Sequence, residues 1–81
     1  MPTYQRKPID VVIDVRSKLE FWLGHLEGAV NVPVDVIAEK IGEVPNVTKN
    51  SRILLVCASG ARSRAAQGIL SSLGYVHVVD G

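Results

Sequence analysis

An apolar run at residues 53–56 leads directly into Cys57 and then into a loop of small residues, and no other stretch constrains the fold as strongly. Beyond the loop, Arg62 and Ser63 open a segment whose apolar residues recur at helical spacing. A short apolar run bounded by loop residues is typical of a buried strand, and a 3.6-residue period indicates an amphipathic helix. We therefore predict a strand, a tight loop and a helix start within residues 53–64, with the one cysteine of the chain at the join. The apolar positions of the predicted helix are Ala65, Ala66, Ile69, Leu70 and Leu73.

The loop after Cys57 has the chemistry of an anion site. Successive backbone N–H groups in a short turn converge on one point, and the following helix adds the partial positive charge of its N-terminus. Arg62 contributes a charge that does not titrate, and Gly60 allows close approach of the backbone. These groups favour the thiolate of Cys57, which is the nucleophilic form. The alternative is a structural cysteine packed in the core, but the placement of Gly60, Arg62 and Ser63 favours a reactive thiol.

The first part of the chain contains a strand pattern followed by a helix start. The apolar residues within 9–15 indicate a strand that is buried on both faces. Ser17 and Glu20 have the spacing of a capping box, which predicts a short helix ending near Leu23, and Gly24 suits its C-terminus.

The middle and the end of the chain continue this alternation. Residues 28–33 are typical of a short strand ended by proline, and Asp35 is a predicted cap for a helix over residues 36–41. Gly74 suits the stop of the last helix, and residues 75–79 form a predicted final strand. Strands that alternate with helices predict an α/β domain with a mainly parallel central sheet flanked by helices.

Several polar residues allow two interpretations. Asp14 and Arg16 close the first strand, where they form either a surface ion pair or a wall of the active pocket with Arg16 facing it. His25 has the chemistry of a general base, but a lone histidine in a turn is more often a hydrogen-bonded structural residue. Arg64 is either part of the site or a solvated side chain of the helix surface.

Composition excludes several classes of function. The chain has 81 residues, enough for one small domain, and a formal net charge of +1, so it has no broad basic field for nucleic acid or membrane surfaces. A single cysteine excludes an internal disulfide and a paired-cysteine zinc site. No apolar run has the length of a membrane span, and the first ten residues lack the apolar segment of a signal peptide, so a cytoplasmic location is expected.

Three motifs, in order, resemble those of the rhodanese family. They are Asp14-Val15-Arg16, the run GHLEGAVNVP at residues 24–33, and the active loop CASGARS at residues 57–63. The resemblance covers about residues 9–81 and implies a small three-layer domain, with residues 1–8 as a loose lead-in. Family members usually continue with a closing helix, so one face of the sheet is expected to lose cover where this chain stops at Gly81.

The resemblance implies a sulfurtransferase without metal or organic cofactor. Cys57 then carries sulfur as a persulfide, taking it from an anionic donor such as thiosulfate. The acceptor is cyanide, a thiol, or a sulfur-relay protein such as thioredoxin. In the family the Gly-His pair, here Gly24 and His25, mainly shapes a turn. The residues predicted to bind the donor are Ala58, Ser59, Gly60, Ala61, Arg62, Ser63 and Arg16.

Two alternatives come from other classes. Phosphatases of the Cys-x5-Arg type, like arsenate reductases, hold a tetrahedral oxyanion in a loop with five residues between cysteine and arginine, whereas four separate Cys57 from Arg62. A reductase also requires a resolving thiol, and the chain has no second cysteine. The other alternative is a non-catalytic module that carries sulfur or binds partner proteins, because a fold does not by itself specify an activity.

Overall fold

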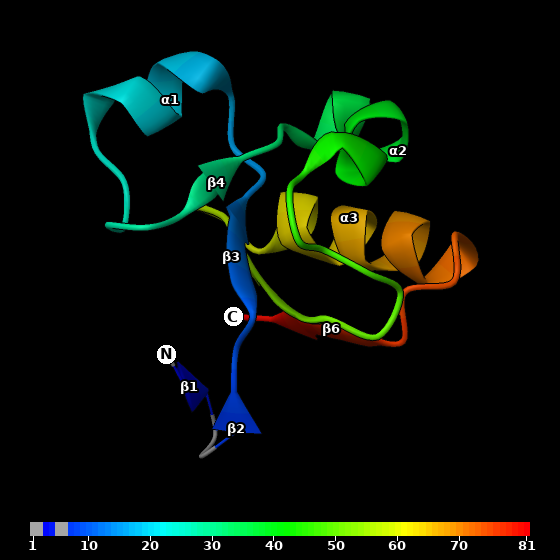
Figure 1. Cartoon of the computed structure of the whole chain (residues 1–81). Coiled ribbons are helices and arrows are strands. Elements are labelled where there is room, and N and C mark those ends of the chain that lie inside the picture. The colour runs from blue at the N-terminus through cyan, green and yellow to red at the C-terminus, as the bar shows by residue number, and fades with distance from the viewer. Residues whose placement is uncertain (1–2, 5–6) are drawn as a thin grey trace.

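The computed structural model describes residues 3–4 and 7–81 (Figure 1). The predicted lead-in over residues 1–8 therefore lies partly outside the described residues. Within it, β1 (Thr3–Tyr4) and β2 (Lys7–Pro8) pair antiparallel as a small ribbon separate from the main sheet. No helix in the part of the chain that the structure describes has the length and apolar character needed to cross a membrane.

The central sheet has four parallel strands in the order β4-β3-β5-β6. They are β3 (Val11–Asp14), β4 (Val30–Asn31), β5 (Arg52–Val56) and β6 (His77–Asp80). This confirms the predicted α/β class. In parallel strands the carboxyl ends share one edge, and the register sets Asp14 opposite both Asn31 and Val56 there. The predicted final strand at 75–79 begins later, at His77, because the Tyr75 N–H donates to the Leu70 carbonyl at the end of the preceding helix.

Local signals account for the first helix, α1 (Lys18–Leu23). The predicted capping box is present: the Glu20 N–H donates to Ser17 Oγ at 3.2 Å, and the Ser17 N–H donates to Glu20 Oε1 at 3.0 Å. These two bonds satisfy backbone donors that a helix start otherwise leaves unpaired.

The second helical segment differs from its prediction. It consists of η1 (Val34–Val36), α2 (Ile37–Lys40) and η2 (Ile41–Glu43), a short α-helix between two 3₁₀ turns. Asp35 lies inside the first turn and makes no side-chain cap, so its predicted role is wrong. Pro33 precedes the segment, and its ring fixes φ at −54°. This dihedral angle suits the start of a turn, so the turn begins before Asp35.

The long helix α3 (Ala61–Ser72) begins immediately after the loop. Its first residue precedes the predicted opening at Arg62 by one. The predicted stop at Gly74 is confirmed: the residue has φ +96°, in the left-handed region that glycine enters without steric cost.

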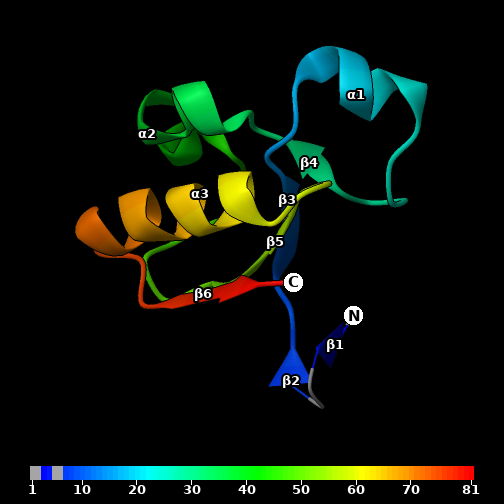
Figure 2. The ribbon, with the colours of Figure 1, turned by 180° about the vertical axis from the view of Figure 1, so that it is seen from behind.

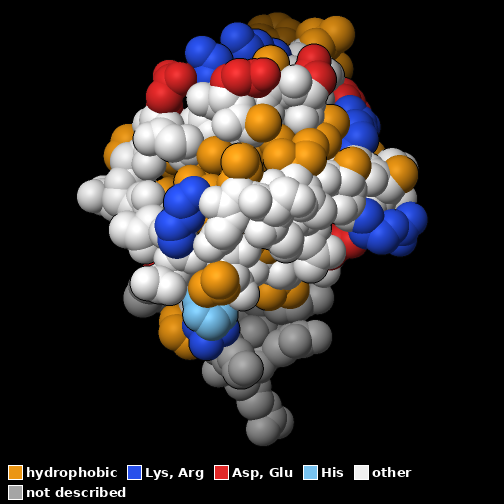
Figure 3. Space-filling model, turned by 90° about the vertical axis from the view of Figure 1, so that its right-hand side faces the viewer, with side chains coloured by type: hydrophobic (Ala, Val, Ile, Leu, Met, Phe, Trp, Pro, Cys, Tyr) orange, Lys and Arg blue, Asp and Glu red, His pale blue; other side chains and the backbone are white. Residues whose placement is uncertain are grey.

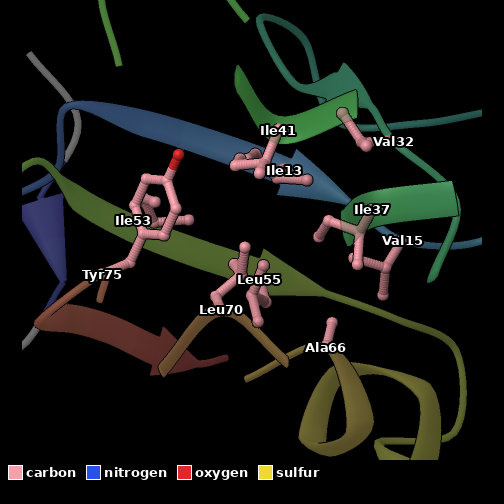
Figure 4. Close-up of a cluster of buried hydrophobic side chains, with 10 residues drawn as sticks. All are labelled: Ile13, Val15, Val32, Ile37, Ile41, Ile53, Leu55, Ala66, Leu70 and Tyr75. Atoms are coloured by element: carbon pink, nitrogen blue, oxygen red, sulfur yellow. The ribbon is translucent and has the colours of Figure 1, made fainter. Parts of the chain in front are cut away.

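A single core lies between the sheet and one layer of helices. Side chains from β3 and β5 point toward those of α2 and α3, which lie on the same side of the sheet (Figure 4). On the opposite side Val12, Leu54 and Val56 are only half-buried, so the prediction of a first strand buried on both faces is wrong for Val12. The buried cluster consists of Ile13, Val15, Val32, Ile37, Ile41, Ile53, Leu55, Ala66, Leu70 and Tyr75.

The surface is mixed in charge. On the face shown in Figure 3, Lys and Arg side chains stand close to Asp and Glu side chains along the same margin, with hydrophobic side chains between them. This agrees with the net charge of +1, because neither sign dominates that face.

Candidate active site

Cys57 is the first residue after β5, at the carboxyl edge of the sheet. Figure 2 shows the loop that leads from β5 into α3. The residues after it are small, and Gly60 takes φ +77°, which places it in the left-handed region. A side chain at that position would be strained, so glycine is required for the loop to turn into the helix. The predicted strand–loop–helix junction is therefore present.

The thiol of Cys57 is partly buried and shifted toward its ionised form. Burial by itself raises the pKa of the thiol. The backbone N–H groups of Ser59 and Gly60, the Ser59 side chain and the charge of Arg62 act in the opposite sense, and the net pKa of Cys57 is lowered. Hydrogen bonds to the charged form are the cause expected in a loop whose amides point inward.

A hollow of about 320 Å³ opens beside Cys57. It brings together three predicted site residues, Arg16, Cys57 and Ala58, while the others lie outside its lining. A larger hollow of about 550 Å³ lies along β4 and contains none of the predicted site residues. The smaller hollow is the candidate site, because it alone of these two includes Cys57. Its lining consists of Asp14, Arg16, His25, Leu26, Val56, Cys57 and Ala58.

Arg16 lines the hollow and forms an ion pair with Asp14 there. Its guanidinium donates to the buried carboxylate of Asp14, with Nη2 at 2.8 Å and Nε at 3.0 Å from Oδ2, and Nη2 also donates to the Gly24 carbonyl at 2.7 Å. The predicted ion pair and the predicted placement at the pocket are thus both present. This arrangement ties the end of β3 to the turn after α1.

Arg62 does not extend freely over the hollow. Its Nη1 and Nη2 donate to the two carboxylate oxygens of Glu20 at 2.6 Å and 2.9 Å, a bidentate pair between residues 42 positions apart in the chain. The hydrogen bonds to Arg62 are the main cause that lowers the pKa of Glu20, followed by those from Ser17. One carboxylate therefore caps α1 and holds the arginine of the active loop.

Glu20 is the site residue that sequence reasoning missed. Its capping-box spacing was visible, but a capping carboxylate has a second oxygen, and nothing local indicates where that oxygen binds. Arg64, for which two interpretations were open, lies beside the loop: its Nη1 is 4.0 Å from the point that a Cβ on Gly60 would occupy. Among the described residues Arg64 makes no ion pair within 4.0 Å, unlike Arg16 and Arg62.

Ser63 supports the loop from behind. It is fully buried, and its hydroxyl lies within hydrogen-bond distance of the Gly60 carbonyl, at 3.0 Å, and of Asp80 Oδ1, at 2.5 Å. Through these contacts the end of β6 is joined to the start of α3. The side chain of Ser63 thus holds the backbone of the loop in place from the core side.

His25 has the geometry of a turn-forming residue. Its Nδ1 donates to the Phe21 carbonyl at 2.7 Å, and its ring stacks on Phe21 with centroids 3.6 Å apart. Because a carbonyl only accepts, Nδ1 carries the proton in this contact. The structural interpretation therefore fits better than that of a general base.

The described residues contain no group of three or more His, Cys, Asp or Glu side chains placed to hold a metal ion. What the site offers is a partly buried thiol with a lowered pKa, inward-facing amides and three nearby guanidinium groups, two of them neutralised. Such a site can stabilise a thiolate and a small negative charge attached to it.

Comparison with known proteins gives the same family along nearly the whole chain. A family model described as a rhodanese-like domain matches residues 3–81. A thiosulfate sulfurtransferase of Escherichia coli, PspE, is 39% identical over 67 residues, which cover 82% of this chain and 62% of that protein. The chain thus spans less than two thirds of the length of this relative. A tRNA uridine(34) hydroxylase of Buchnera aphidicola is 30% identical over 71 residues, covering 84% of this chain and 23% of that protein.

Solved structures of rhodanese-like proteins have the same fold as this chain. A rhodanese with anions from Escherichia coli superposes with a TM-score of 0.79 at 36% identity, covering 88% of this chain and 82% of that one. The likeness therefore extends over most of the chain.

Proposed function

Because the chain belongs to the rhodanese-like domain family, we propose that it is a sulfurtransferase in which Cys57 carries one sulfane sulfur. The observation that supports this most is the loop itself: the Ser59 and Gly60 amides lower the pKa of Cys57, and four residues separate it from Arg62. A loop with four residues between cysteine and arginine suits one sulfur atom. A phosphoryl group requires the wider loop of the Cys-x5-Arg enzymes.

The proposed reaction has two displacement steps. The Cys57 thiolate attacks the outer sulfur of thiosulfate, a new S–S bond forms, and sulfite leaves with the electron pair of the broken bond. An acceptor nucleophile such as cyanide or a thiolate then attacks the outer sulfur of the persulfide. The S–S bond to Cys57 breaks, its electron pair returns to the cysteine as thiolate, and the acceptor departs with the sulfur.

The remaining residues have proposed roles in holding the outer sulfur. The backbone N–H groups from Ala58 to Ser63 face the charge of the persulfide. Arg62 and Arg16 attract the anionic donor, at reduced strength because each is bound to a carboxylate. Arg64 adds the guanidinium that has no carboxylate partner within 4.0 Å among the described residues.

A second candidate is a sulfur carrier that receives its sulfur from another protein. The pairing of Arg16 with Asp14 and of Arg62 with Glu20 favours it, because paired guanidinium groups attract a small anion less strongly than free ones. In that case Cys57 still forms a persulfide, but thiosulfate is a poor donor.

Intact mass and transfer kinetics test both candidates. After incubation with thiosulfate the protein is expected to gain the mass of one sulfur atom and to convert cyanide to thiocyanate, and Cys57→Ser is expected to do neither. Ser72→Ala, an exposed position on α3, serves as the matched control. A protein that gains sulfur only from protein persulfides would be a carrier, and hydrolysis of an aryl phosphate without any sulfur transfer would contradict both proposals.

A further inference from the structure

The apolar stripe of α1 faces solvent. Leu19, Trp22 and Leu23 stand at i, i+3 and i+4, the spacing that normally turns a helix toward a core. Their exposed fractions are 65%, 78% and 72%, and α1 contains no buried residue. Exposed apolar residues that form a contiguous group mark interaction sites more often than scattered ones do.

Polar contacts set this orientation. Glu20, between the apolar positions, points inward to the guanidinium of Arg62, and the Phe21 ring stacks on His25. Glu20 and Phe21, which make these contacts, lie on a different side of the helix from the stripe, and the stripe is left exposed to solvent. The helix is therefore held to the active loop by an ion pair, and its apolar side remains available.

The stripe continues into the mouth of the site. Leu26, in the turn after α1, is 59% exposed and also lines the hollow beside Cys57. We name Leu19, Trp22, Leu23 and Leu26 the α1 rim. The loop after Cys57 presents Ala58, which lines the same hollow, and Ser59, and both residues are small and exposed.

We propose that the α1 rim docks a protein that presents a reactive cysteine within an apolar surface, and that this protein exchanges sulfur with Cys57. The inference rests on the sulfurtransferase proposal. In the forward direction the partner's thiolate attacks the outer sulfur of the Cys57 persulfide. The partner becomes the persulfide, and Cys57 leaves as thiolate with the electron pair of the broken S–S bond.

The continuity through Leu26 is the reason for choosing this occupant. Leu26 belongs both to the rim and to the hollow that contains Cys57, so a protein docked on the rim lies next to the thiol. That position suits a partner that exchanges sulfur with Cys57. Lys18 and Glu27 flank the rim with opposite charges, so the docking is expected to depend on apolar contact and to change little with salt.

The experiment compares a small acceptor with a protein acceptor. Thiosulfate is the donor, cyanide is the small acceptor, and reduced thioredoxin is the protein probe because it carries an exposed reactive cysteine. The variants are Trp22→Glu and Leu23→Glu, with Val76→Glu as the matched control, since Val76 is 63% exposed but lies before β6 at the opposite edge of the sheet. A lost apolar anchor is expected to lower kcat/KM for thioredoxin about tenfold or more. The rate with cyanide, and both rates of Val76→Glu, are expected to stay unchanged.

Other results would overturn the docking proposal. An unchanged rate with thioredoxin would remove the rim from the transfer, and an equal fall with both acceptors would show damage to the loop instead. An emission maximum of Trp22 that moves to longer wavelength on dilution would identify a second copy as the occupant. A wild-type protein that gains no sulfur and transfers none to cyanide would instead refute the sulfurtransferase proposal, a result independent of the rim variants.

Discussion

The helices α1 and α3 carry similar apolar spacing but bury it differently. In α3 the side chains of Ala66 and Leu70 are fully buried against the sheet, and the helix belongs to the core. In α1 the equivalent stripe faces solvent, and the contacts that hold the helix are a capping box and an ion pair. Apolar periodicity thus indicates that a helix forms, whereas the direction of the stripe depends on which neighbours are within reach.

The largest expected difference between the two helices is in stability. Leu70→Ala removes a fully buried side chain and is expected to lower the free energy of unfolding by about 2–5 kcal/mol. Leu23→Ala removes a side chain that is largely exposed, so a change within about 0.5 kcal/mol is expected. Urea denaturation followed by circular dichroism measures both. Equal losses would mean that α1 is packed against something in solution.

A second prediction concerns the ion pair that joins α1 to the active loop. If Arg62 attracts the donor by its charge alone, Glu20→Gln should improve the use of thiosulfate and Arg62→Ala should impair it. We expect both variants to lose kcat/KM, because the bidentate contact positions the guanidinium and the loop. Steady-state kinetics with thiosulfate and cyanide measure this, with Lys40→Gln, in an exposed pair with Glu43, as the control. A gain in Glu20→Gln would show that the carboxylate only neutralises the arginine.

The smallest expected effect is a dependence on pH. Because the pKa of Cys57 is lowered in the folded chain, the rate of alkylation by iodoacetamide should have its midpoint below the free-thiol value of about 8.5. A lowered pKa of an acid stabilises the folded state above the unfolded pKa, and this contribution is lost as the pH falls through the folded pKa. The difference in unfolding free energy between wild type and Cys57→Ser should therefore grow from neutral pH to about pH 9. A midpoint at or above the free-thiol value would contradict the lowered pKa.

Much of the scaffold follows from local patterns in the sequence. The apolar run at 53–56, the capping box at Ser17 and Glu20, and the glycine at position 74 each appear in the structure where they were expected. Asp35 is the counterexample, because the fixed φ of Pro33, two residues earlier, starts that helical segment before Asp35. Local sequence signals therefore predict the boundary of an element well where only one signal is present. They predict it poorly where two signals, such as a proline and a capping aspartate, lie close together.

The sequence by itself determined the position of Cys57 after a strand, the short loop that follows it and the α/β order of the elements, because these depend on neighbours within a few residues. Tertiary structure alone decided that Glu20 binds Arg62, 42 residues away, and that the apolar side of α1 consequently faces solvent beside Cys57. A carboxylate and a guanidinium pair with whichever opposite charge the fold brings near. That choice depends on how α1 and the loop after β5 meet at the carboxyl edge of the sheet, which no spacing along the chain encodes.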